Sequence, residues 1–156
     1  MVDSEIESHL TDLRRIYVEA TPRQRLSVAK QRILNPEHDP NRLIAYVSAV
    51  EGFARTLCMH LRAKTKAELS AIYPEYRWRG AEELVVEYFD AKGFGPPASH
   101  FEDGVWDLFC YAVQYRNLLA HECTYLGLDK SRGLVDACRT VLRKLAAHEG
   151  LNADDI

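Results

Sequence analysis

The chain has 156 residues and a formal net charge of −3. This length suits one domain with a core large enough to fold without disulfides, and the slightly acidic balance excludes a basic protein that coats nucleic acid without specificity. The four cysteines form no CxxC pair, and no apolar run is long enough for a signal peptide or a membrane span. We therefore expect a cytoplasmic protein with free thiols and no membrane association.

The N-terminal segment, residues 1–35, predicts two basic helices. Apolar residues recur at helical spacing from Glu5 to Ala20. Thr21-Pro22 is typical of an N-cap followed by proline at the first helical position, and this second helix is expected to end near Leu34. Its basic side chains either face solvent or form a rim that contacts phosphate. The candidates for RNA contact are Arg23, Arg25, Lys30 and Arg32.

The middle of the chain predicts two helices joined by a connector. From Asn41 to Lys64 apolar residues recur every three or four positions, which indicates a long helix with one buried face. The segment Tyr73–Gly80 is rich in aromatic residues and arginine, and we interpret it as the connector. A shorter helix is expected from Ala81 to Ala91, ended by the glycines and prolines of Gly93–Pro97.

The last third of the chain predicts two further helices. Ser99 is expected to cap the first, with Glu102 completing a capping box, and this helix runs towards His121. The final helix is expected over residues 129–148. No segment shows the two-residue period of a strand. The sequence thus predicts an all-α fold, a compact up-and-down-like bundle of about five to six helices, in a single domain over residues 1–156.

One arginine interrupts an apolar helix face. At about 100° per residue, Arg116 falls in the middle of the stripe, and a guanidinium there is costly unless it is paired. Glu51 lies on the core face of the Asn41–Lys64 helix, so a bidentate pair between the two is expected. The pair either only fixes helix register or aims Arg116 into a pocket. The stripe consists of Val105, Phe109, Ala112, Val113, Leu119 and Ala120.

Arg116 is also part of a motif. Four residues separate it from His121, and the polar Asn117 follows it directly. Late in an apolar helix of a small all-α chain, this segment resembles the R-x4-H signature of HEPN domains, the helical nucleotide-binding domains of higher eukaryotes and prokaryotes. The resemblance covers residues 41–148, and residues 1–35 are an elaboration.

The resemblance implies a metal-independent endoribonuclease of single-stranded RNA, without cofactor or bound metal. In many HEPN proteins Arg and His from two subunits meet in one cleft, so a homodimer is implied, with Arg116, Asn117 and His121 as catalytic residues. His121 would take the proton of the 2′-OH, Arg116 would stabilise the phosphorane, and the product would be a 2′,3′-cyclic phosphate. Asn117 would bind a phosphate oxygen or orient His121, and Glu51 would aim Arg116. Such a protein would act as a toxin or defence component, with an antitoxin as partner.

Helix geometry favours a shared cleft. Arg116 and His121 point about 140° apart on a regular helix, so they converge only if the helix distorts or ends near Ala120, or if a partner subunit completes the site. Alternatively, His121 only contacts carbonyls at the helix end. A zinc site with Cys123 lacks properly spaced ligands. Three interpretations stay open: an endoribonuclease, a non-catalytic HEPN-fold dimer that binds nucleotide, RNA or protein, and a helical dimer with a purely structural Arg116–Glu51 pair.

Overall fold

The computed structural model describes residues 2–19, 21–24, 27, 40–124 and 128–156. Within these ranges the protein is all-helical, as the sequence predicts, and contains no strand. Seven helical elements have defined bounds in this part of the chain: α1 (Val2–Glu19), α3 (Pro40–Arg62), α4 (Lys66–Tyr76), α5 (Ala81–Ala91), the 3₁₀ helix η2 (Pro97–His100), α6 (Val105–His121) and α7 (Leu128–His148).

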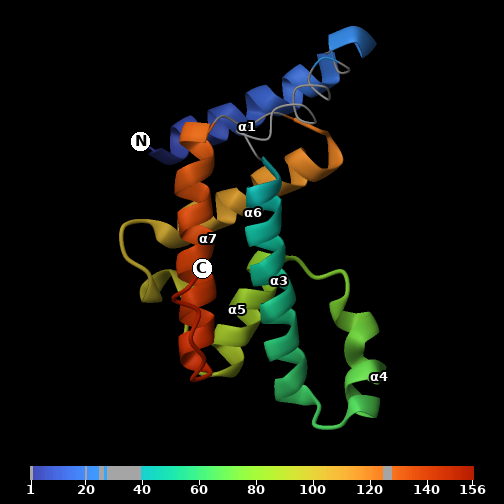
Figure 1. Ribbon diagram of the computed structural model, residues 1–156, viewed down its shortest axis with the longest axis vertical. Coiled ribbons are helices and arrows are strands. Elements are labelled where there is room, and N and C mark those ends of the chain that lie inside the picture. Colours follow the sequence, from blue (N-terminus) through green and yellow to red (C-terminus); the bar gives the residue numbers. More distant parts are fainter. Residues whose placement is uncertain (1, 20, 25–26, 28–39, 125–127) are drawn as a thin grey trace.

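Helices α3, α5, α6 and α7 form the centre of the molecule. α3 and α7 run along its long axis, and α5 and α6 cross them obliquely (Figure 1). α3 contacts all three of the others, and α7 also contacts α6. α1 lies across one end against α6, while α4 stands beside α3 at the other end (Figure 1). The expected pair of Glu51 and Arg116 requires α3 and α6 to pack against each other, and this contact is confirmed.

The helical periodicity of α3 explains its place in the core. Its apolar residues at three- and four-residue spacing are fully buried, as a single face turned inward requires. α5 contributes the large side chains Tyr88 and Phe89, neither of which is exposed at all. The buried residues of α3 are Leu43, Val47, Val50, Ala54 and Cys58.

One helix was not expected. α4 occupies Lys66–Tyr76, so the predicted Tyr73–Gly80 connector begins inside a helix, and that prediction is wrong. The helix starts with a capping box, in which the Glu68 N–H donates to Thr65 and the Glu68 carboxylate accepts from the Thr65 N–H. Pro74 lies in the last turn of α4, where its ring lacks the N–H that would bond to the carbonyl four residues earlier.

The start of α6 also differs from the prediction. Ser99 does not cap it, because the Ser99 hydroxyl donates to the Pro96 carbonyl within the turn of η2. α6 instead begins at Val105, after Asp103 and Gly104 in the left-handed region at φ 53° and 70°. Glycine adopts this conformation without strain, so Gly104 sets the direction of α6.

The predicted N-cap at Thr21 and the predicted final helix can both be compared with the structure. The N–H of Gln24 donates to the Thr21 hydroxyl, and the Gln24 side chain accepts from the Thr21 N–H, so the predicted N-cap is confirmed. Residues 22–24 and 27 are helical as expected, and the other residues of that predicted helix lie outside the described part of the chain. α7 matches the expected final helix to within one residue. Among the described helices, none is both long enough and apolar enough to cross a membrane.

Candidate functional site

Arg116 lies where α6 passes α3, and only 16% of its side chain is exposed. Its Nη2 donates to Glu51 Oε2 at 2.7 Å, which confirms the predicted pair. The pairing is not bidentate, because the other guanidinium nitrogens have different acceptors. Nε donates to Asn117 Oδ1 at 3.0 Å and Nη1 donates weakly to Ser48 Oγ at 3.5 Å. α3 therefore fixes the orientation of Arg116.

Glu51 is shared between two arginines. Its Oε1 accepts from Arg55 Nη2 at 3.0 Å while Oε2 accepts from Arg116. Burial by itself would raise the pKa of Glu51, but the hydrogen bonds from Arg116 and Arg55 outweigh it and hold that pKa below its ordinary value. The carboxylate is thus ionised at neutral pH and keeps both guanidinium groups in place.

Arg55 connects this pair to the start of α5. Its Nε donates to the Tyr76 carbonyl at 3.1 Å and its Nη2 also donates to the Arg79 carbonyl at 3.1 Å. Sequence reasoning missed Arg55, although its position four residues after Glu51 places both on one face of α3. Sequence reasoning also missed Ser48, although its position three residues before Glu51 places it on the same face of α3.

The site carries a net positive charge and has donors to spare. Two guanidinium groups and one carboxylate sum to +1. An arginine has five N–H donors, and the contacts of Arg116 with described residues use three of them. The remaining donors and the net charge suit an anion such as a phosphate. We call Arg116, Glu51, Arg55, Ser48 and Asn117 the arginine site.

Asn117 is exposed and its amide is oriented by Arg116. Because its carbonyl oxygen accepts from Arg116 Nε, its NH₂ group points away from the guanidinium and can donate to a ligand. The side chain thus extends the set of donors at the arginine site.

His121 is exposed at the end of α6. The helix continues without a break to this residue, because the Glu122 N–H still donates to the Leu118 carbonyl at 2.9 Å. α6 thus ends at His121, one residue beyond Ala120, and up to this end it is regular, a geometry in which Arg116 and His121 point about 140° apart. Ala120 was expected on the buried stripe but is exposed, since the end of α6 turns this side to solvent.

One of the four expected RNA-binding residues lies in the described part of the chain. Arg23 is exposed, and Arg25, Lys30 and Arg32 lie outside the described residues, so their role stays a prediction. A hollow of about 360 Å³ elsewhere on the surface is lined by the carboxylates of Glu7, Glu82 and Asp107. Its charge would repel phosphate, so an RNA would not bind there.

Three of the four cysteines lie in surroundings that make them unreactive. All four are free thiols, and burial raises the pKa of Cys58, Cys110 and Cys138 to about 12. A thiol with such a pKa is a poor nucleophile at neutral pH. In the described part of the chain, no three His, Cys, Asp or Glu side chains gather closely enough to hold a metal ion.

The arginine site thus has the charge and donors to bind a phosphate, with a histidine on the same helix. Comparisons of the chain with protein-family models, with curated proteins and with solved structures find no match.

Proposed function

We propose that the protein is a metal-independent endoribonuclease with a HEPN-like helical bundle, in which the Arg116 and His121 sets of two subunits share one cleft. The observation that carries the proposal is the state of Arg116. It is aimed by Glu51 and Ser48, keeps N–H donors to spare, and lies on the same helix as the exposed His121. A fixed cation and a solvent-accessible imidazole are the two groups that attack by a ribose 2′-OH requires.

In the proposed reaction His121 removes the proton of the 2′-OH, and this oxygen attacks the adjacent phosphorus. The bond to the 5′-oxygen of the next nucleotide breaks, and that oxygen leaves as a 5′-OH after it receives a proton. Arg116 stabilises the negative charge on the equatorial oxygens, and the Asn117 NH₂ donates to one of them. The products are a 2′,3′-cyclic phosphate and a 5′-OH. We propose that the protein acts as a toxin or defence component held in check by an antitoxin.

The dimer follows from helix geometry. Because α6 is regular up to His121, the imidazole and the guanidinium of one subunit point about 140° apart, and the histidine of a partner subunit would complete the site. A symmetric dimer brings the same surface of both subunits together, so two such sets would line the cleft.

The first experiment incubates the protein with labelled single-stranded RNA in EDTA. We expect cleavage that ends in a 2′,3′-cyclic phosphate, because the attacking group is the neighbouring 2′-OH. His121→Ala should lower the rate about 10²- to 10⁴-fold without affecting the fold, because the side chain is exposed. His60→Ala, at an exposed histidine near the end of α3, is the matched control and should cut like wild type.

A mixing experiment tests the shared cleft. Arg116→Ala and His121→Ala dimers are each expected to be inactive. A mixed dimer would contain one intact pair out of two, formed by the Arg116 of one subunit and the His121 of the other. After equimolar exchange about half of the dimers are mixed, so about a quarter of the wild-type rate should return. No restoration, in spite of demonstrated exchange, would contradict the shared site, and intact RNA with wild-type protein would contradict the nuclease.

The second candidate is a non-catalytic HEPN-fold dimer that binds nucleotide, RNA or protein. The observation in its favour is that three acceptors hold Arg116, as in a structural pair. This function predicts RNA or nucleotide binding that Arg116→Ala weakens, with no cleavage product at any pH.

A further inference from the structure

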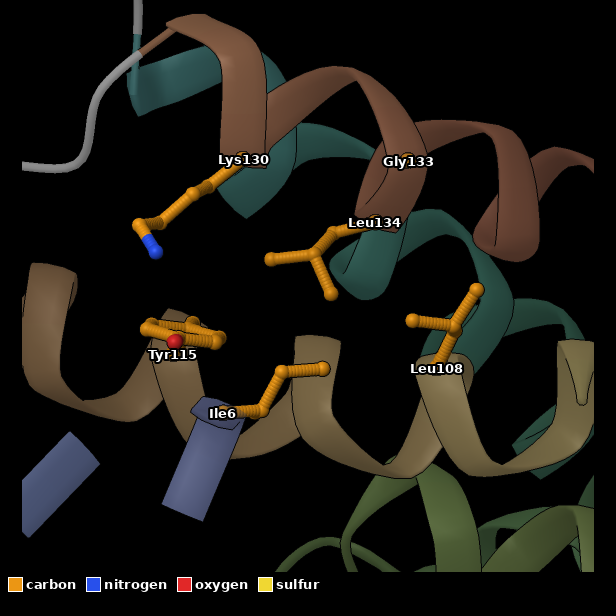
Figure 2. A pocket seen from close by; sticks show the side chains of 6 residues that line it. All are labelled: Ile6, Leu108, Tyr115, Lys130, Gly133 and Leu134. Carbon is orange, nitrogen blue, oxygen red and sulfur yellow. The ribbon is translucent and has the colours of Figure 1, made fainter. Parts of the chain in front are cut away.

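A second hollow lies between α1, α6 and α7, on the face of α6 next to the one that carries Arg116. It has a volume of about 180 Å³ and is bounded by three helices. Leu108 and Tyr115 stand two turns apart on one face of α6, and Ile6 of α1 closes one side (Figure 2). Leu134 of α7 faces them across the space. The walls are therefore almost wholly apolar.

One charged group reaches into this hollow. Figure 2 shows Lys130 extending from α7 towards the Tyr115 ring, with its ammonium at one end of the space and Leu108 at the other. No ion pair within the described residues includes Lys130. The Tyr115 hydroxyl is already in a hydrogen bond with His9 Nδ1 at 2.6 Å. The ammonium is thus the polar group available to a ligand.

Gly133 of α7 lines the hollow without covering it. It lies inside the helix sequence, is itself exposed, and a Cβ built on it would meet no atom within 4 Å. Glycine lowers the stability of a helix relative to alanine. At position 133 it leaves the edge of the hollow uncovered by a side chain.

We propose that this hollow binds a small monocarboxylate, with the apolar body between α1, α6 and α7 and the carboxylate on Lys130. An apolar cavity of about 150 Å³ accommodates benzene, so about six to eight carbon atoms fit here. The charge of Lys130 selects an acid over the corresponding alcohol. The ligand also joins α1 to the central helices, since Ile6 becomes part of its binding surface. This inference does not depend on the proposed nuclease.

The test titrates the full-length protein with hexanoate and with benzoate, followed by heteronuclear NMR. Saturable shifts are expected for amides around Ile6, Tyr115 and Gly133, with slower hydrogen exchange in α1 once the ligand is bound. Hexan-1-ol and benzyl alcohol are the neutral probes, and they should bind about three- to tenfold more weakly.

Two pairs of variants locate the site. Gly133→Leu places a side chain in the hollow and should weaken hexanoate binding at least about tenfold, whereas Gly52→Leu, at an exposed glycine inside α3, should not. Lys130→Gln should remove the preference for the acid, whereas Arg132→Gln, an exposed cation two residues further along α7, should keep it. Circular dichroism checks that each variant is folded.

Three results would overturn the proposal. The first is the absence of saturable shifts with either acid. The second is a folded Gly133→Leu variant that binds hexanoate like wild type. The third is equal affinity for acid and alcohol in wild type, which would remove the role of Lys130.

Discussion

Tyr115 and Arg116 are neighbours in the sequence and lie on adjacent faces of α6, about 100° apart around the helix axis. Arg116 faces α3, where Glu51, Ser48 and Asn117 accept from its guanidinium. Tyr115 faces α1 and α7 and forms a wall of the apolar hollow. On the first side every described partner is polar and fixed in position, and on the second side apolar surface is left unfilled. One helix thus contributes to a site held by charged hydrogen bonds and to an apolar hollow that no side chain fills.

This difference teaches what each side depends on. The arginine site is stable only as a set, because removing one charge leaves another partly buried without its partner. The hollow depends instead on how α1, α6 and α7 pack around it, and Gly133 leaves its edge on α7 without a side chain. Mutations at the two sites should therefore change the free energy of unfolding in opposite directions and by different amounts.

The largest expected effect on stability is that of Glu51→Ala. The substitution leaves Arg116 and Arg55 facing each other without their shared carboxylate, so we expect a loss of about 2–4 kcal/mol in the free energy of unfolding. Chemical denaturation measures it. Glu83→Ala, whose carboxylate is 63% exposed, is the control and should cost no more than about 1 kcal/mol. Equal effects of the two substitutions would mean that the arginine site does not organise α3 and α6.

The second effect is a dependence on pH. The pKa of Glu51 is depressed in the folded protein, so its ionised form contributes stability above its ordinary pKa of about 4.5. That contribution is lost as the pH falls through the lower pKa of the folded state. Glu51→Gln should therefore be about 1–2 kcal/mol less stable than wild type at pH 7, with a difference that shrinks below about pH 4. A difference that stays constant down to pH 3 would contradict the assigned role of the carboxylate.

Much of the polar side of α6 was predictable from sequence. A guanidinium on an apolar stripe and a carboxylate on another are violations of a simple pattern, and their pairing follows from the cost of leaving either alone. α5 was predicted to the residue for a similar reason, since its apolar spacing ends at a clear glycine and proline break. Charge pairing on apolar helix faces and helix ends at glycine and proline can thus be predicted from a single sequence.

The parts that were missed depend on tertiary structure or on weak patterns. In α4 only Tyr76 is buried and Leu69 and Ile72 are half-buried, so its apolar stripe is short, and both this stripe and the capping box were overlooked in the sequence. Ser99 fits the capping rule, but a bond to Pro96 within η2 uses its hydroxyl. The apolar hollow could not be predicted at all, because it is formed by residues of three helices around an absent side chain.

The smallest expected effect concerns that absent side chain. Gly133→Ala and Gly52→Ala should each raise the free energy of unfolding by about 0.5–1 kcal/mol, because both positions are inside helices with open space at Cβ. Leucine separates the two positions. At Gly133 it would cover apolar surface of the hollow, and about 30 Å² of additional burial corresponds to about 0.8 kcal/mol, whereas at Gly52 it would face solvent. Gly133→Leu should therefore exceed Gly52→Leu in stability by about this amount, measured by thermal and urea unfolding. Equal stabilities would mean that a side chain at position 133 turns to solvent, and that α1 and α7 leave no apolar surface to cover.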